Sequence, residues 1–462
     1  MAIPQLDAQI RDILKQLPAA NAFEIYTIST TATPIASLTP KQRLPTVHAT
    51  RTTELKRLIL LVQKNQRNMH PSGGEGGQEE RHLVCGLSVR EFVTVVAYPA
   101  QARQRTQSGA PVPHAEIHAN VYLEKIDSSG HLSLSQTSAI SPMRAAITGY
   151  LAFVTQLYHD VLKSLRVYTF ARAQPEYLFA MSSKNRNKHQ LDDAQLVRWW
   201  KKSFDIAGTY IASRYPQKLP SHIKASAFLP GSDHSEAGWL KETCPFPQAL
   251  RPSFGSALQV GDRCQWSWGL GYPPDAKAHD CIPQYPDDPM TRLLQKPESA
   301  KWTVENAMDM VAISEECGAG RRTAFFALDI PTCSPHFFGC SSTSTPSTSG
   351  PSSPRHALNI PLLSHREFEQ VELSLFDHSM DFSQSQTSLQ STARFTKWLG
   401  SRFPSIKPLE MITSGSAVVI DNAAQETSGG TQNDSHSSKR NTEAVVNTLS
   451  TNIVRKKQKV KP

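Results

Sequence analysis

The alternation of hydrophobic and polar positions predicts a chain that mixes helices with strands. Residues 6–17 carry apolar side chains at helical spacing with charges on the other face, and this helix is expected to stop at Pro18. The segment from Phe23 to Thr30 alternates as a half-buried strand does. Residues 54–62 follow as a helix-compatible patch. The pattern in the N-terminal region therefore predicts a helix, then a strand, then a second helical segment.

Two further strands are predicted at residues 87–98 and 117–126, and the polar insert between them is typical of a long surface loop. The second strand runs into Asp127-Ser-Ser-Gly130, a turn whose glycine can adopt a positive φ. Residues 143–162 are predicted to be helical and residues 165–171 to form another strand. We therefore expect a hairpin-like strand pair followed by a helix and a strand.

A longer helix is predicted to begin near Asp192, because apolar residues recur there every three or four positions. This buried stripe consists of Leu196, Trp200, Phe204, Ala207 and Ile211. A helical pair is predicted over residues 364–376 and 387–399. The irregular alternation of strands and helices favours a mixed α/β fold.

Segments rich in Ser, Thr, Pro and Gly interrupt this pattern and cannot bury enough apolar surface to order themselves. We therefore predict one large domain over residues 1–412 that carries disordered inserts. The inserts are expected at about residues 68–82, 99–116 and 334–356, and the domain is followed by a disordered linker (413–441) and a basic C-terminal tail (442–462).

The composition narrows the classes of function. A net charge of +9 favours anionic partners such as nucleotide phosphates, nucleic acid or acidic proteins, although many basic proteins are simply kept soluble by such a charge. The seven cysteines form no C-x-x-C pair, which argues against a zinc ribbon and indicates free thiols in a reducing compartment. Because no apolar run approaches the roughly 20 residues needed to cross a bilayer, we expect a soluble, intracellular protein.

The most informative stretch runs from Phe170 to Trp200. It contains F-A-R-A-Q-P-E-Y-L-F, then S-S-K-N, K-H-Q-L and a tandem W-W. A second motif, I-P-Q-Y-P-D-D-P-M-T-R, ends at Arg292, and a third is the turn Lys125-Ile-Asp-Ser-Ser-Gly130. Taken in this order, the motifs resemble those of the fungal histone H3 lysine-56 acetyltransferase family, whose patterns are F-x-R-x-x-x-Q/E-Y-L-F, I-P-x-F-P-D-D-P-K-x-R and S-K-A-D-x-x-G.

The resemblance implies a fold similar to that of the CREB-binding-protein acetyltransferases, in which helices wrap a central mixed β-sheet. It also implies acetyl-coenzyme A as co-substrate, no metal, and a lysine of histone H3, lysine 56 by analogy, as acceptor. Expected partners are histones H3–H4 and chaperones of the anti-silencing-function and nucleosome-assembly-protein types. The expected setting is the nucleus, in nucleosome assembly, DNA replication and repair. The basic cluster at residues 455–461 suits nuclear import or an acidic partner, or is only a solvated tail.

Acetyl transfer needs a neutral amine, and a free lysine has a pKa near ~10.4. An apolar tunnel and a carboxylate that accepts the proton both meet this need. By resemblance, Tyr177 and Trp200 are the tunnel aromatics and Trp199 lies nearer the cofactor. The position of Trp200 on the apolar stripe also suits ordinary core packing. The carboxylate candidates are Asp287 and Asp288, stiffened by flanking prolines, with Asp288 as the preferred base; an ordinary surface turn is the alternative.

The remaining predicted site residues surround the cofactor. A basic loop at residues 184–189 suits the phosphates of coenzyme A, although a solvated loop or a nucleic-acid patch would have the same composition. The residues predicted to contact the cofactor are Ile126, Asp127, Ser128, Arg144, Phe170, Gln174, Lys188, His189, Gln190, Leu191 and Trp199.

One departure from the family pattern opens an alternative. Met290 stands where the pattern has lysine, and the resemblance implies that this lysine is acetylated and supports activity. The chain could therefore be a catalytically degenerate protein that binds histones or chaperones. Direct nucleic-acid binding ranks last, because the sequence contains no recognition motif for it. The leading prediction is a histone acetyltransferase.

Overall fold

The computed structural model describes most of the N-terminal 414 residues, all within one compact unit, residues 1–418. The described residues are 5–18, 21–38, 49–65, 80–97, 115–134, 140–158, 162–215, 222–232, 234–242, 264–318, 323–331 and 361–414. The predicted linker after residue 414, the basic tail and the insert at 334–356 lie outside them.

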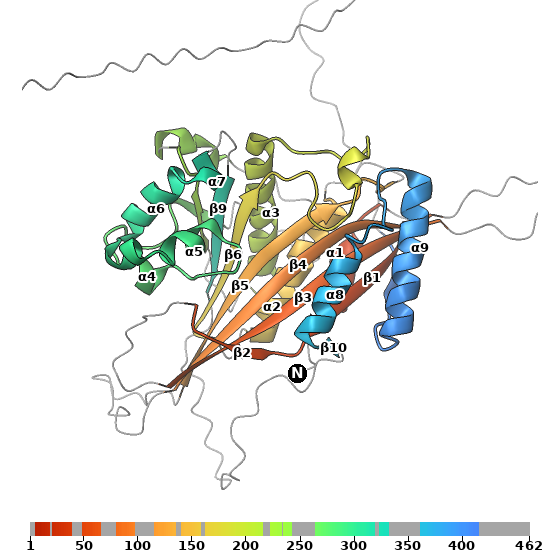
Figure 1. Cartoon of the computed structure of the whole chain (residues 1–462), viewed down its shortest axis with the longest axis horizontal. Coiled ribbons are helices and arrows are strands. Elements are labelled where there is room, and N and C mark those ends of the chain that lie inside the picture. The colour runs from red at the N-terminus through yellow and green to blue at the C-terminus, as the bar shows by residue number, and fades with distance from the viewer. Residues whose placement is uncertain are drawn as a thin grey trace, which may run out of the picture. The chain divides into compact units, whose positions relative to one another are not determined.

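One mixed sheet organises the described part of the chain (Figure 1). Its eleven strands run in the order β10-β1-β3-β4-β5-β6-β9-β7-β8, with β11 paired to β1 and β2 paired to β3. The strands are β1 (Ala22–Thr30), β2 (Thr33–Ile35), β3 (Ala49–Asn65), β4 (Glu80–Ala97), β5 (Ala115–Ser128), β6 (Ser164–Arg172), β7 (Ile223–Phe228), β8 (Cys264–Trp268), β9 (Thr323–Ile330), β10 (Leu362–Leu363) and β11 (Leu409–Ile412).

Helices cover both faces of this sheet (Figure 1). One face packs against α1 (Leu6–Leu14), α2 (Pro142–Tyr158) and α3 (Asp193–Arg214). The opposite face carries two groups. One consists of α8 (His365–Ser374) and α9 (Ser385–Arg402), and the other of α4 (Ala278–Cys281), α5 (Pro289–Leu294), α6 (Val304–Ala312) and α7 (Glu315–Gly318). Short 3-10 turns complete the fold at Ser182–Lys184, His234–Lys241 and Pro297–Lys301.

The fold class and most predicted elements are confirmed, including the helix near Asp192. Asp192 caps α3: its side chain accepts a hydrogen bond from the Gln195 backbone N–H, and the Gln195 side-chain oxygen accepts one from the Asp192 backbone N–H. The α3 residues Trp200, Phe204 and Ile211 are buried as the stripe predicts. None of the helices in the described ranges is both long and apolar enough to span a membrane.

The predicted helix at residues 54–62 is wrong, because these residues belong to β3. The strand is covered on both faces: Ile59 and Leu61 enter the core under α1–α3, whereas Leu58 and Leu60 pack toward α8 and α9. A strand buried on both faces has a continuous apolar run and no alternation, so its sequence does not show the period of a strand. β4 and β5 also extend into the predicted inserts, over 80–82 and 115–116.

A buried ion pair ties the centre of the sheet to α2. The guanidinium of Arg57 donates to the carboxylate of Glu91, and both side chains are 1% exposed. Tyr150 and Tyr158 of α2 donate their hydroxyls to the same carboxylate, at 3.0 and 3.2 Å. Ser29 accepts a further Arg57 hydrogen bond at 2.9 Å. The pair is therefore enclosed, and its remaining hydrogen bonds are made by two neighbouring elements, β1 and α2.

We expect Glu91→Gln to destabilise the fold, because it leaves the Arg57 charge buried without a counter-ion. The expected loss in free energy of unfolding is about 3–5 kcal/mol, measured by denaturant titration. The double change Arg57→Met with Glu91→Leu should cost less than Glu91→Gln alone, since it removes both charges. Asp12→Asn, at a surface pair on α1, is the matched control. A Glu91→Gln variant as stable as this control would contradict the argument.

Candidate active site

The site begins where two parallel strands separate. β5 and β6 pair in parallel from His118–Ser164 to Tyr122–Tyr168, and the pairing ends there. Beyond this point β5 continues beside β4 and β6 continues beside β9. The hydroxyl of Thr169 donates to the Leu123 carbonyl at 3.0 Å, just past the last pair. A V-shaped opening therefore forms in the middle of the sheet, with its apex at the two tyrosines.

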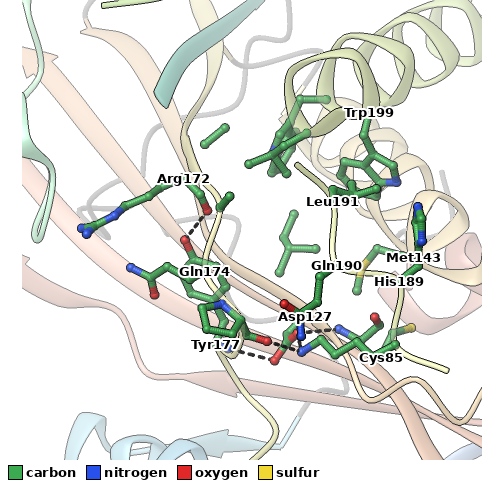
Figure 2. A pocket seen from close by; sticks show the side chains of 18 of the residues that line it. Cys85, Asp127, Met143, Arg172, Gln174, Tyr177, His189, Gln190, Leu191 and Trp199 are labelled. Atoms are coloured by element: carbon green, nitrogen blue, oxygen red, sulfur yellow. Dashed lines mark hydrogen bonds and ion pairs between the residues drawn. The ribbon is translucent and has the colours of Figure 1, made fainter. Parts of the chain in front are cut away.

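A cavity of about 810 Å³ occupies this opening. Its walls are the diverging ends of β5 and β6, the first turns of α2 and α3, and the segment 173–192 that joins β6 to α3. Figure 2 shows Trp199 and Leu191 on one side, with Gln174, Tyr177 and Asp127 on the other. Ligand sites in proteins are concave, largely apolar and of this size. The pocket is therefore the candidate active site.

Asp127 holds the outer wall of the pocket in place. Its Oδ2 accepts from the backbone N–H groups of Tyr177, Leu178 and Phe179 at 2.9, 2.9 and 3.3 Å. Its Oδ1 accepts from the Ser128 N–H at 2.8 Å and from Lys188 Nζ at 2.7 Å (Figure 2). Asp127 was predicted to contact the cofactor. In the structure its carboxylate bonds to the backbone of residues 177–179 and to Lys188, and so holds the pocket wall against β5.

Lys188 is turned inward rather than toward a ligand phosphate. Besides Asp127, its ammonium donates to the Pro175 carbonyl and to Ser182 Oγ, both at 2.8 Å. An ammonium has three donors, so these three bonds satisfy it. Within the predicted basic loop, Lys184, Arg186 and His189 remain exposed, and His189 lines the pocket.

Gly130 completes the support of this wall. Its φ is +84°, and a Cβ placed there would lie 2.7 Å from the backbone nitrogen of Lys188. Any other residue would be strained in this conformation and would press against the loop. The D-S-S-G turn therefore acts through its first and last residues, which together dock the loop that carries Tyr177.

The two predicted tunnel aromatics both line the pocket. Tyr177 is half-buried and donates its hydroxyl to the Arg172 carbonyl at 2.6 Å (Figure 2). Burial raises the pKa of Tyr177, so the phenol stays neutral. Trp200 is 5% exposed, lies in the core beside Phe204, and meets Trp199 edge to face with centroids 5.3 Å apart. Trp200 thus belongs to the core and to the pocket wall at once.

The structure brings together most of the residues predicted from the sequence. Those that line the pocket are Ile126, Asp127, Ser128, Phe170, Gln174, Tyr177, Lys188, His189, Gln190, Leu191, Trp199 and Trp200. Arg144 is adjacent, with its guanidinium 5.1 Å from the ring centre of Trp199. The lining also contains residues that the sequence did not predict, among them Cys85, Glu124, Leu132, Met143 and Leu196. Cys85 reaches the pocket only because β4 pairs with β5, which no local pattern shows.

The two predicted carboxylates lie outside the pocket lining. Asp288 is 1% exposed and begins α5, where its carboxylate accepts from the Met290 N–H at 2.9 Å. Asp287 is exposed, with φ +60°. The side chains thus diverge as predicted. The role of Asp288 as proton acceptor stays a prediction.

Asp288 is nevertheless close to the apex of the opening. Tyr285 stacks on Tyr122 and Tyr168, with centroids 4.7 and 4.9 Å away. Burial first, and the nearby Asp288 charge second, raise the pKa of Tyr122 and Tyr168 well above the usual value. Asp288 therefore lies close to neutral phenols at the apex, and neither this carboxylate nor the three rings line the pocket.

Comparison with known proteins identifies the architecture. Residues 138–398, more than half of the chain, match the family model of the histone acetyltransferase KAT11-type domain. The chain belongs to this family. Its pocket lining from Ser141 to Trp200 falls inside the matched range, as do Asp287 and Asp288.

Individual relatives agree with the family. The chain is 31% identical over 246 residues to histone acetyltransferase rtt109 of Aspergillus flavus, covering 46% of this chain and 42% of that protein. It is 26% identical over 219 residues to histone acetyltransferase rtt109 of Schizosaccharomyces pombe, covering 46% and 52%. The chain thus spans about half the length of the curated relatives it matches. The crystal structure of Rtt109 from Aspergillus fumigatus has the same fold, with a TM-score of 0.60 at 21% identity, covering 88% of this chain and all of that one.

We expect Asp127→Asn to loosen the pocket wall. Asparagine offers one acceptor oxygen instead of two and removes the counter-ion of buried Lys188, at a cost of about 3 kcal/mol in free energy of unfolding. Hydrogen exchange should accelerate at the amides of Tyr177, Leu178 and Phe179 relative to the wild type.

Gly130→Ala should accelerate exchange at the same amides, since it disturbs the loop from the other side. Asp275→Asn, at an exposed position, is the matched control and should leave exchange unchanged. Wild-type protection of residues 177–179 in Asp127→Asn would show that the carboxylate does not hold the wall.

Proposed function

We propose that this protein is a histone lysine acetyltransferase that transfers acetyl from acetyl-coenzyme A to histone H3. The observation that carries the proposal is the pocket between the separated strands β5 and β6, which lies in a chain of the KAT11-type family. The pocket is lined by aromatic and aliphatic side chains and contains most of the residues that the family resemblance assigned. Both the lysine side chain and the acyl donor need such an enclosed apolar site.

The residues present suit acetyl-coenzyme A. The first turns of α2 and α3 line the pocket, and the positive end of a helix dipole attracts phosphate. His189 lies on the same wall, and Arg144 lies beside it over Trp199. Leu191, Leu196 and Met143 add apolar surface for the uncharged arm. When bound, acetyl-coenzyme A would supply the activated acyl group as a thioester.

The protein's own contribution is to receive the amine and keep it neutral. The rings of Tyr177 and Trp200 line the site and exclude water, so an ammonium entering it loses solvation and its pKa falls. A carboxylate near the opening would accept the proton, and Asp288 remains the candidate that the family pattern supplies.

The finer proposal is that lysine 56 of histone H3 is the acceptor and that histone chaperones present it in the nucleus. The motif resemblance supports this, as do the relatives' names as histone acetyltransferases. The basic cluster at 455–461 is consistent with nuclear import. Chaperone contact would link the reaction to nucleosome assembly, replication and repair.

A catalytically degenerate histone-binding protein is the second candidate, because of Met290. Its side chain is fully buried in the apolar cluster beneath α5 and α6. The position that the family pattern gives to lysine is thus filled here by a core residue. Binding of coenzyme A without turnover would favour this candidate.

The deciding experiment is transfer of labelled acetyl to H3–H4, with and without a chaperone. We expect site-specific labelling of H3 that increases with the chaperone. Asp288→Asn tests the base that the family pattern supplies: a loss of roughly 10²–10⁴-fold in rate would identify Asp288 as the proton acceptor, and a rate close to the wild type would exclude it. Asp309→Asn, at an exposed position on α6, is the control. A folded protein that binds coenzyme A and labels no histone would establish the degenerate candidate.

Met290→Lys should be destabilising, since it places an ammonium in an apolar cluster. The expected fall in free energy of unfolding is of the order of several kcal/mol, unless Asp288 pairs with the new charge. Met290→Leu, which keeps volume and polarity, should stay within about 1.5 kcal/mol of the wild type. Equal melting temperatures for the two variants would show that the site accommodates a cation.

A further inference from the structure

Glu124 lines the pocket close to its apex, although the sequence analysis gave it no role. The pairing of β4 with β5 shifts register there: Ser88 pairs with Lys125, but Val89 pairs with Leu123. Glu124 is therefore the extra residue of a β-bulge. Bulges bend a strand and re-aim a side chain, and they are frequent beside active sites. This bulge lies two residues beyond the last parallel pair.

Glu124 and Phe170 hold equivalent places on the two strands. The last parallel pair is Tyr122 with Tyr168. Glu124 lies two residues after Tyr122, Phe170 lies two residues after Tyr168, and both line the pocket. They therefore face the opening where it is narrowest. A substrate lysine that reaches the narrow end of the pocket would come close to the Glu124 carboxylate.

The charge around Glu124 is unusual for a pocket wall. Arg90 donates to both of its carboxylate oxygens, through Nε at 2.9 Å and Nη2 at 2.7 Å. The same guanidinium donates through Nη1 to Glu54 at 3.0 Å. Two carboxylates thus share one cation, and the three groups together carry one net negative charge. Protonation of Glu124 would leave Arg90 paired with Glu54, so no buried charge would be stranded.

The other carboxylates of the pocket wall are committed elsewhere. Asp127 is held by backbone amides and Lys188, and Asp192 accepts the capping hydrogen bond from the Gln195 N–H at 2.7 Å. Asp193 lies beside it in the first turn of α3, away from the apex. Asp288 does not line the pocket. Glu124, two residues beyond the last parallel pair, is the pocket carboxylate nearest the apex along β5, and its Arg90 partner is shared with Glu54.

We propose that Glu124 accepts the proton that the substrate lysine loses before acetyl transfer, an inference that rests on the proposed function. An N–H bond of the ammonium breaks, its proton passes to a Glu124 carboxylate oxygen, and the amine lone pair is freed. The amine nitrogen then forms the amide bond as the C–S bond of the thioester breaks, and the second amine proton goes to the leaving sulfur. Glu124 returns its proton to solvent after the product departs.

The family's turn pattern, S-K-A-D-x-x-G, has serine where this sequence has Glu124. Among the described residues, Arg90 and Glu54 are the charged groups bonded in the Glu124 cluster, and burial followed by the Asp288 and Glu124 charges raises the pKa of the neutral Tyr122 phenol beside it. Burial opposes the charge of Arg90, but hydrogen bonds and charges from Glu124 and Glu54 outweigh it and raise its pKa. Arg90 therefore remains a cation throughout an ordinary assay range.

The test compares Glu124→Gln with the wild-type protein in acetyl transfer to H3–H4 between pH 6.5 and 9.5. Glutamine keeps the size and a hydrogen bond to Arg90 but accepts no proton. At pH 7 we expect kcat to fall about 100-fold or more, with unchanged KM for acetyl-coenzyme A. The deficit should narrow as pH rises, because more of the lysine is already neutral in solution.

Glu116→Gln provides the matched control, since it makes the same change on β5 at the end remote from the pocket. It should keep wild-type kcat. Should Glu124→Gln fail to fold, as judged by melting and coenzyme A binding, Glu124→Asp keeps the charge but withdraws it by one methylene. It should then give an intermediate rate.

The outcomes separate this inference from the proposed function. An inactive wild-type protein would overturn both. If the wild-type protein acetylates histone and the kcat of Glu124→Gln is within twofold of the wild-type kcat, only the role of Glu124 is overturned. A loss that is equal at every pH and accompanied by weaker coenzyme A binding would also overturn it, because it would indicate a structural role.

Discussion

The end of the parallel pairing between β5 and β6 is the constraint on which the site depends. A central strand is normally hydrogen-bonded on both edges, and an opening in the middle of a sheet exposes backbone groups that need other partners. Here each strand stays hydrogen-bonded to its other neighbour: β5 continues along β4, and β6 continues along β9, so the two strands diverge. The α2 and α3 helix starts, together with the loop 173–192, line the space that opens. The pocket is thus a consequence of sheet topology more than of any single motif.

An opening in a sheet is useful only if its walls hold their positions, and charged groups with complete sets of partners provide this. Asp127, Lys188 and Gly130 dock the outer loop against β5. Arg57 and Glu91 lock β3, β4 and α2 together behind it. In both places the charge is buried, so loss of one partner costs more than the intact pair contributes. The two clusters therefore specify a geometry more than they add stability.

The sequence predicted the elements that alternate, such as β1, and the helix with a one-sided apolar stripe, α3. It failed at β3, because burial on both faces removes the period from which a strand is recognised. Family motifs located the pocket walls at Tyr177, His189 and Trp199, since those residues lie close together along the chain. The sequence predicted that Lys188 and Asp127 contact the cofactor, whereas in the structure they bond to each other and to the pocket wall. Residue spacing shows which residues are near a site but not in which direction their side chains point. Cys85 and Glu124 depend on strand pairing and on a bulge, which only the folded chain reveals.

The chemistry of the site sets how strong its base must be. Under the proposed function, a substrate lysine enclosed by Tyr177 and Trp200 would lose hydration, and its pKa would fall toward neutrality before any carboxylate acts. A base of modest strength then suffices, provided it lies at the opening and can be neutralised without leaving a counter-ion buried alone. Glu124 satisfies this second condition through Arg90 and Glu54. Asp288 lies outside the pocket lining, close to the neutral phenols of Tyr122 and Tyr168. Its charge would attract the incoming substrate ammonium toward the apex, and in the proposed mechanism the proton itself passes to Glu124 at the bulge.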